Sequence, residues 1–220
     1  MVILLFGASG VAGGGVLKAC LEDPLVTEVR AIVRRPLSIG HPKLREFAHA
    51  DFTDFGTVRS AFTNVDACFY CVGISTLQAS DEAHYRAITH DYATAAARQL
   101  HTASPKAVFH FISSDGISLD SRLMWARVKA ETERDLMKLG PTICYRPAYI
   151  DGAGSESEPK TYKLIRPVFS AILRPFPQMY VKAVDIGRAM LSAARTGLVG
   201  EIIDNRRIHD LAQASGRSPQ

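Results

Sequence analysis

Residues 2–16, VILLFGASGVAGGGV, carry the clearest structural pattern of the chain. Its first five residues are apolar, which is typical of a strand buried on both faces of a parallel sheet. Glycines follow at positions 7, 10 and 13, and the segment from Val11 to Glu22 has the pattern of a helix that ends before Pro24. A strand that leads through a glycine turn into a helix predicts a nucleotide site, because free N–H groups at the helix start bind phosphate oxygens.

The three glycines suit three different needs of such a turn. Gly7 permits a sharp turn, Gly10 lets the backbone approach a diphosphate, and Gly13 allows the helix to pack closely on the strand. We therefore predict that these glycines bind a dinucleotide cofactor together with Ser9 and Val11. A turn that is rich in glycine for structural reasons alone is the alternative.

Strand and helix patterns alternate as far as residue 147. Apolar runs predict further strands at 27–34, 45–50, 65–72, 107–113 and 142–146, and helices are predicted after Asp54, at 81–101 and at 121–139. This alternation is typical of an α/β, doubly wound parallel sheet with helices on both faces, the Rossmann fold. We expect residues 1–147 to form an NAD(P)-binding core.

Residues 148–220 are predicted to form a small C-terminal elaboration, packed on the same domain over the substrate cleft. The run at 147–160 is loop-like, and an amphipathic helix at 160–177 is interrupted by Pro167. In our interpretation this helix covers the cleft, and a homodimer contact or attachment to an anionic membrane are the alternatives. A helix at 184–195, a short strand at 200–204 and a frayed tail at 214–220 complete the chain.

The composition narrows the classes of function. The chain of 220 residues is 47% hydrophobic and 22% charged, as in ordinary globular proteins. Its formal net charge of +4 permits anionic ligands but does not indicate a nucleic-acid binder. The apolar start is too short for a signal peptide or a membrane span, so we expect a cytoplasmic protein.

The cysteines and histidines predict no metal site. Cys68 and Cys71 form a CxxC pair, but they lie in a predicted buried strand, where residues three apart point to opposite faces. We therefore predict buried, reduced thiols for this pair and for Cys20 and Cys144. The histidines at 84, 90, 101 and 110 show no metal-ligand clustering with acids or thiols, and we expect them to be structural or surface residues.

The strand at 27–34 ends in VRRP, which bears on the choice of cofactor. An NAD site places an acidic residue near this point for the ribose 2′-OH, whereas arginine suits the 2′-phosphate of NADP. Arg34 and Arg35 therefore predict a preference for NADP(H) over NAD(H). A solvated basic strand end is the alternative.

Three more candidate cofactor contacts follow the next two strands. Asp51 and Phe52 come after the third strand, and Gly73 closes the fourth. Because ligands of open α/β sheets bind at the carboxyl ends of the strands, we expect Asp51 and Phe52 near the adenine and Gly73 near the adenosine ribose.

Several motifs together resemble a known family. They are GASGVAG, VRR, ADFTD, ISSDG, the WxxxK pattern from Trp125 to Lys129, and YRPAYI. The sequence resembles the short-chain dehydrogenase/reductase superfamily, and within it the atypical NAD(P)H-binding branch that is NmrA-like and Tat-interactive-protein-like. The resemblance covers roughly residues 1–203 and implies an oxidoreductase that acts on a small carbonyl or alcohol.

The resemblance also implies roles for residues of the second half. A serine after the fifth strand, Ser113 or Ser114 with Ser114 as our choice, would polarise the substrate carbonyl. Lys129 would hold the nicotinamide ribose, and the backbone around Pro147 would pass near the nicotinamide amide. The position of the family's proton-donating tyrosine is taken by Trp125, whose indole N–H cannot give up a proton near neutral pH.

This departure leaves several accounts open. Tyr149, Asp115 or a water molecule could supply the proton, the protein could bind NADP(H) without efficient turnover, or the reaction could be a direct hydride exchange. The leading hypothesis is an NADP(H)-binding oxidoreductase with an altered catalytic set. The alternatives are a non-catalytic NADPH/NADP⁺ sensor or scaffold with a protein partner and, less favoured, an epimerase or dehydratase of nucleotide sugars. The sequence does not identify the small-molecule substrate.

Overall fold

Seven parallel strands form the central sheet of this computed structural model, which describes residues 1–152, 172 and 178–215. The strand order is β3-β2-β1-β4-β5-β6-β9, and every pairing in it is parallel. The strands are β1 (Val2–Phe6), β2 (Glu28–Val33), β3 (Leu44–Ala48), β4 (Ala67–Tyr70), β5 (Val108–Ile112), β6 (Thr142–Arg146) and β9 (Ile202–Asp204). The order reverses between β1 and β4, where doubly wound sheets bind ligands. The predicted Rossmann fold is confirmed.

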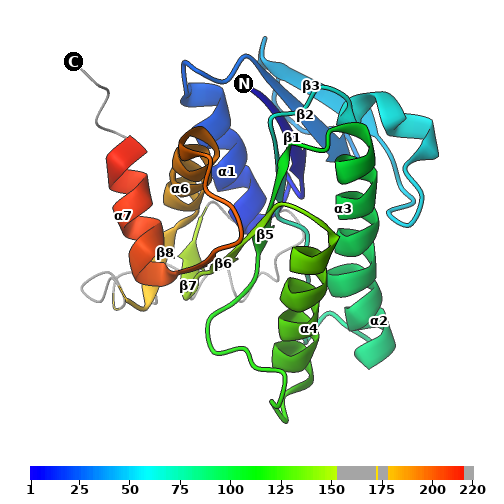
Figure 1. Ribbon diagram of the computed structural model, residues 1–220, viewed down its shortest axis with the longest axis vertical. Helices are drawn as coiled ribbons and strands as arrows, with labels where there is room; N and C mark the ends of the chain where they lie inside the picture. Colours follow the sequence, from blue (N-terminus) through cyan, green and yellow to red (C-terminus); the bar gives the residue numbers. More distant parts are fainter. Residues whose placement is uncertain (153–171, 173–177, 216–220) are drawn as a thin grey trace.

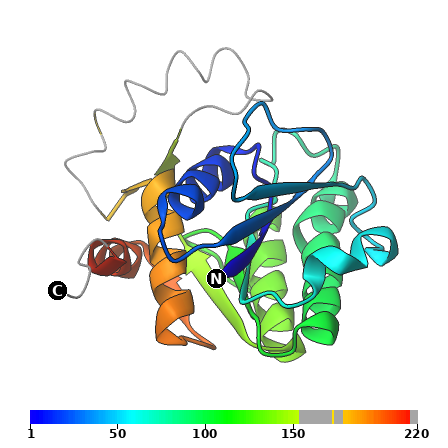
Figure 2. The same cartoon turned by 90° about the horizontal axis from the view of Figure 1, so that it is seen from above.

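Helices cover both faces of the sheet (Figures 1 and 2). One face carries α1 (Val11–Glu22), α6 (Ala183–Thr196) and α7 (Asn205–Ser215). The other carries the 3₁₀ helix η1 (Gly56–Phe62), α2 (Glu82–Arg86), the π-helical turn η2 (Ala87–Asp91), α3 (Tyr92–Ala103) and α4 (Met124–Leu139). Elements α2, η2 and α3 follow one another without a break and together replace the single helix that the sequence predicts at 81–101.

The alternation of side chains along each strand divides the apolar residues between two cores. In β1, Ile3 and Leu5 face α1 and α6, whereas Leu4 and Phe6 face η1 and α3. All four side chains are fully buried. The apolar run that opens the sequence therefore supplies both cores, as expected of a central parallel strand.

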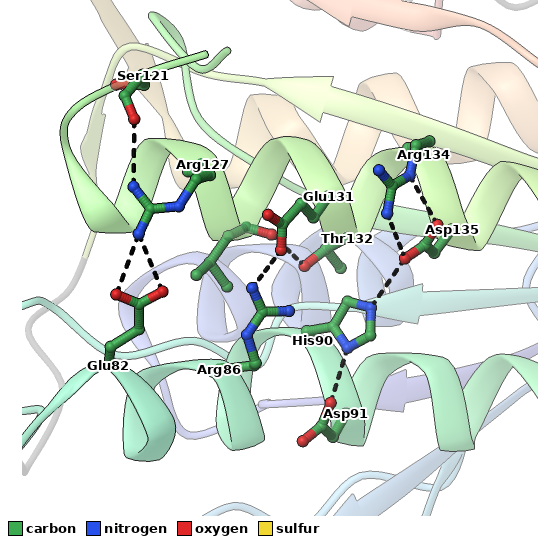
Figure 3. Close-up of polar contacts among 11 residues, drawn as sticks. Glu82, Arg86, His90, Asp91, Ser121, Arg127, Glu131, Thr132, Arg134 and Asp135 are labelled. Atoms are coloured by element: carbon green, nitrogen blue, oxygen red, sulfur yellow. Dashed lines mark hydrogen bonds and ion pairs between the residues drawn. The ribbon is translucent and has the colours of Figure 1, made fainter. Parts of the chain in front are cut away.

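A row of polar pairs joins α2 and η2 to α4 (Figure 3). Arg127 donates to both carboxylate oxygens of Glu82 at 3.0 Å, Arg86 pairs with Glu131, and His90 Nε2 lies 3.2 Å from Asp135. The partners recur every four residues on both helices, which places them on one side of each helix. These pairs fix α4, which carries the predicted lysine, against its neighbouring helix.

The C-terminal third differs from the sequence-based expectation in two places. Within the run at 147–160, predicted as a loop, Tyr149–Asp151 forms strand β7, which pairs in parallel with β8 (Tyr180–Lys182). The pairing joins residues about 30 apart, so no local pattern announces it. Helix α7 was not predicted, because its sequence, NRRIHDLAQAS, is mostly polar and has few apolar residues at helical spacing. The predicted helix at 160–177 lies outside the described residues except for residue 172.

Two elements from beyond residue 147 pack directly on the predicted core. Strand β9 extends the main sheet beside β6, and α6 packs against α1. A β-carbon at Gly187 would lie 2.7 Å from the β-carbon of Ala19, so the two helices approach closely at this glycine. In the described residues no helix is long and apolar enough to cross a membrane.

Candidate functional site

The glycine loop brings the start of α1 directly against the end of β1. Gly7 has a φ of +76°, and a β-carbon there would lie 2.6 Å from the carbonyl oxygen of Cys71. A β-carbon at Gly13 would lie 2.0 Å from the carbonyl oxygen of Gly7. Side chains at either position would therefore force the loop apart.

The first turn of α1 offers backbone donors to an anion. Gly10 is the residue before the helix, no acidic residue lies in the first turn, and the first N–H groups of a helix have no partner within it. Ser9 is exposed, and Val11 is partly exposed at the helix start. These features fit a dinucleotide diphosphate held by the backbone, as the sequence predicts.

The two arginines lie at the same edge of the sheet. β1 and β2 are paired, with Phe6 opposite Ile32, so the loop after β1 and the arginines after β2 emerge side by side. Arg34 and Arg35 are both exposed, and within the described part of the chain neither guanidinium has a hydrogen bond or ion pair. They are therefore available to a phosphate group at this edge.

Three more candidate contacts also lie beyond the ends of their strands, and each would present a different group to a ligand: Asp51, Phe52 and Gly73. Asp51 accepts hydrogen bonds from the N–H and the hydroxyl of Thr53 at 2.9 and 2.5 Å, and the Thr53 hydroxyl is the main cause of the lowered pKa of this carboxyl. The ring of Phe52 is buried and stacks on Tyr92 at 5.7 Å, so only its backbone can meet a ligand. A side chain at Gly73 would meet open space.

Lys129 links α4 to the end of β5. Its Nζ donates to the carbonyl oxygen of Ser113 at 2.8 Å. Burial lowers the pKa of this ammonium to about 8, and the charge of Glu133 opposes that shift. Lys129 is therefore a partly buried amine at the carboxyl edge of the sheet, able to exchange a proton near neutral pH.

The two candidate serines have different surroundings. Ser113 is 3% exposed, and its hydroxyl has no hydrogen-bond partner among the described residues. Ser114 is partly exposed, and its role as the serine that meets the substrate stays a prediction.

Trp125 occupies the first turn of α4, one turn before Lys129. Its side chain is partly buried and packs on the small apolar cluster of Ile117, Ala126 and Ala130. The indole thus adds apolar surface to this cluster, and its N–H does not act as an acid near neutral pH.

The other candidate proton donors follow β5 and β6. Asp115 is exposed, and its N–H donates to the carbonyl oxygen of the buried Pro147 at 3.1 Å. Tyr149 lies in β7 with its ring stacked on Tyr180 at 6.4 Å. The loop after β5 and the turn after β6 are therefore joined through their backbones.

Sequence reasoning missed three features of this edge. Glu133 forms a buried ion pair with Arg146, and its position four residues after Lys129 is the signal that could have revealed it. A β-carbon at Gly152 would lie 2.9 Å from the carbonyl oxygen of Val11, which places the end of β7 beside the glycine loop. Asn205 accepts a hydrogen bond from the N–H of Ala148 at 3.0 Å, a contact between distant segments with no local signal.

Comparison with known proteins identifies the family. The model of the NAD dependent epimerase/dehydratase family matches residues 3–122, which contain the glycine loop, the arginine pair and both serines. The chain belongs to this family. The family's description supports a nicotinamide cofactor for this chain.

Individual relatives of this epimerase/dehydratase-family chain extend over nearly its whole length. Protein fmp52, mitochondrial, from Aspergillus clavatus is 30% identical over 210 residues, which cover 91% of this chain and 89% of that protein. Protein HTATIP2 from Rattus norvegicus is 27% identical, covering 97% and 90%. These likenesses confirm the predicted place in the atypical branch of the short-chain dehydrogenase/reductase superfamily.

A solved structure supports the fold. The crystal structure of the Bordetella bronchiseptica enzyme WbmF in complex with NAD⁺ matches with a TM-score of 0.69 at 15% identity, covering 100% of this chain and 79% of that one. At this identity the likeness concerns the fold alone.

The relatives correct one prediction. Several fmp52 proteins are named as mitochondrial, which contradicts the cytoplasmic location expected from the sequence. That expectation rested on the length of the apolar start, which tests for a secretory signal or membrane span and carries no information about mitochondria.

Proposed function

We propose that this protein is an NADP(H)-dependent oxidoreductase that interconverts a small carbonyl compound and its alcohol. The observation that carries the proposal is the Lys129 amine, held 2.8 Å from the Ser113 carbonyl oxygen at the sheet edge where the glycine loop also lies. A charged amine with a lowered pKa at the carboxyl edge of a parallel sheet is typical of a catalytic site.

The cofactor would lie along the carboxyl edge of the sheet. In this proposal the N–H groups at Val11 to Gly13, at the start of α1, hold its diphosphate, and Arg34 and Arg35 hold the 2′-phosphate. Asp51, the Phe52 backbone and Gly73 border the adenosine, and Lys129 and the Pro147 backbone border the nicotinamide half. The cofactor supplies or accepts a hydride when bound.

The chain's own residues would orient the substrate and move the proton. Ser114, partly exposed at the end of β5, donates a hydrogen bond to the substrate carbonyl. Trp125 presents an apolar surface where the family's tyrosine would stand. Because the pKa of Lys129 is lowered to about 8, this ammonium can release a proton near neutral pH, which the indole cannot do.

Trp125 also favours a second candidate function. Without a phenol beside the lysine, the same site could hold NADP(H) and report the NADPH/NADP⁺ ratio to a protein partner. The two candidates share every cofactor contact and differ only in turnover.

The test is NADPH consumption with a panel of aldehydes and ketones, for the wild type, Lys129→Met and Trp125→Tyr. The oxidoreductase proposal expects wild-type turnover that falls about 100-fold in Lys129→Met, in line with the loss of a proton-transfer group. Turnover that appears only in Trp125→Tyr, with NADPH binding intact in the wild type, would instead establish the sensor. Absence of NADPH binding in the wild type would reject both.

A further inference from the structure

An ion pair lies behind the site, between α4 and the end of β6. The carboxylate of Glu133 accepts hydrogen bonds from Arg146, with Nε at 3.1 and 3.2 Å from its two oxygens and Nη2 at 2.6 Å from Oε2. The Glu133 side chain is 3% exposed and that of Arg146 is 30% exposed. A buried carboxylate with two-point pairing to a guanidinium is held in one orientation.

Glu133 lies one turn after Lys129 on the same side of α4. The two side chains do not form an ion pair among the described contacts, so Glu133 acts on the amine through its charge. The Lys129 amine donates a hydrogen bond to the carbonyl oxygen of Ser113, and this contact ties α4 to the end of β5. The N–H of Ser113 in turn donates to the carbonyl oxygen of Tyr145, the residue before Arg146. Helix, β5 and β6 are thus joined around the amine.

The charges near this amine come from three elements. Glu133 on α4 favours the charged ammonium, while burial disfavours it. Arg146 at the end of β6 pairs with Glu133, and Asp115 in the loop after β5 acts on Arg146 through its charge. Burial drives the amine toward the neutral form, and the negative charge of the fixed Glu133 carboxylate opposes that shift.

We propose that Glu133 and Arg146 form a positioning pair that keeps the Lys129 ammonium charged and directed at the carboxyl edge of the sheet. Glu133 provides the negative charge, and Arg146 holds that carboxylate in one orientation in its buried position. The inference rests on the proposed function only for the role of Lys129 in cofactor binding and proton transfer. The charge state of Lys129 is a property of the protein itself and can be measured without cofactor.

The experiment is an NMR titration of carbon-13-labelled lysine in the full chain. The Cε resonance of Lys129, assigned by its absence from Lys129→Arg, is followed against pH in the wild type and in Glu133→Gln. The matched control is Glu131→Gln, on the same helix, which removes a carboxylate paired with Arg86 on the neighbouring helix (Figure 3). Glu133→Asp keeps the charge and serves as the conservative rescue.

The wild-type amine is expected to titrate near pH 8. In Glu133→Gln its pKa should fall by about one unit, a tenfold loss of proton affinity, with the wild-type value kept in Glu131→Gln and largely restored in Glu133→Asp. An unchanged pKa in Glu133→Gln, or an equal fall in Glu131→Gln, would overturn the proposal.

A second variant keeps the test decisive if Glu133→Gln does not fold. The double variant Glu133→Gln, Arg146→Gln leaves no unpaired buried charge and should again lower the pKa of Lys129, whereas an unchanged or raised pKa would overturn the proposal. The outcome is separate from the proposed function. A lowered pKa of Lys129 in Glu133→Gln, in a protein that binds no NADPH, would support the positioning pair and reject the oxidoreductase. An unchanged pKa in a protein that binds and consumes NADPH would reject the positioning pair and support the oxidoreductase.

Discussion

Gly13 lies so close to Gly7 that a β-carbon at position 13 would come within 2.0 Å of the Gly7 carbonyl oxygen. Helix α1 thereby begins directly against the end of β1, and its first N–H groups open toward the carboxyl edge of the sheet. One residue further on the constraint is absent, because a β-carbon at Gly14 would lie 3.5 Å from the carbonyl oxygen of Ala8, an ordinary contact.

This difference gives a matched pair of variants. Gly13→Ala should lower the free energy of unfolding by about 2 kcal/mol, because the loop must move away from the new methyl group, and should weaken NADPH binding at least tenfold. Gly14→Ala should raise stability by about 0.5–1 kcal/mol, as alanine does within helices, and leave binding intact. Urea unfolding and fluorescence titration measure both. Equal effects of the two substitutions would show that the loop geometry is unimportant.

Arg34 and Arg35 should decide between the two nicotinamide cofactors. Replacing both with alanine removes charge-assisted hydrogen bonds to the 2′-phosphate, so NADPH affinity should fall about 10- to 100-fold while NADH affinity stays the same. Arg59→Ala, at an exposed arginine of η1, is the control for a general loss of positive charge. A parallel loss for both cofactors would point to a diffuse electrostatic effect in place of phosphate recognition.

The buried His110 should make stability depend on pH. Its Nδ1 lies 2.9 Å from the Tyr145 hydroxyl, and full burial lowers the pKa of the imidazole from 6.5 to about 3. Between pH 6.5 and 3 the unfolded chain binds a proton that the folded protein does not, so stability must fall as the pH falls through this window. The loss should amount to about 3–5 kcal/mol in total.

Urea unfolding at a series of pH values tests this dependence. His110→Asn should show a clearly smaller loss of stability between pH 6.5 and 3 than the wild type, whereas His84→Asn, at an exposed histidine, should behave like the wild type. The assignment to His110 fails if its variant and the wild type lose stability in parallel.

The single tryptophan of the chain lies in the site as an internal reporter. If the nicotinamide ring binds between Lys129 and Pro147, bound NADPH should quench the emission of Trp125 and show sensitised nicotinamide fluorescence. Trp125→Phe provides the blank. Calorimetrically detected binding without any change in Trp125 emission would place the nicotinamide elsewhere.

The sequence was most informative where local pattern and fold agree. Helix α1 and strand β6 have the predicted bounds, because glycines and prolines mark their ends. In contrast, β7 and β8 pair across a long intervening segment, and η2 inserts a π turn into a helix with no distinctive residue to announce it. Local periodicity carries no information about either.

As with the fold, the parts of the candidate site that depend on local pattern were predictable, and those that depend on packing were not. The glycines and arginines follow strand ends, and parallel topology alone brings strand ends together. The hydrogen bond from Lys129 to the Ser113 backbone, and the Glu133–Arg146 pair behind it, depend on how α4 packs on β5 and β6. Such packing joins residues from three separate segments, which one sequence does not reveal.

We propose above all that the loop at Gly7 to Gly13 and the arginines after β2 bind NADP(H). Isothermal titration calorimetry of the purified chain with NADPH and NADH, repeated for the Arg34→Ala, Arg35→Ala double variant, tests it most directly. We expect one-to-one binding, tighter for NADPH than for NADH in the wild type, with that preference lost in the double variant. Absence of binding heat with both cofactors, or equal affinity for both in the wild type, would contradict it.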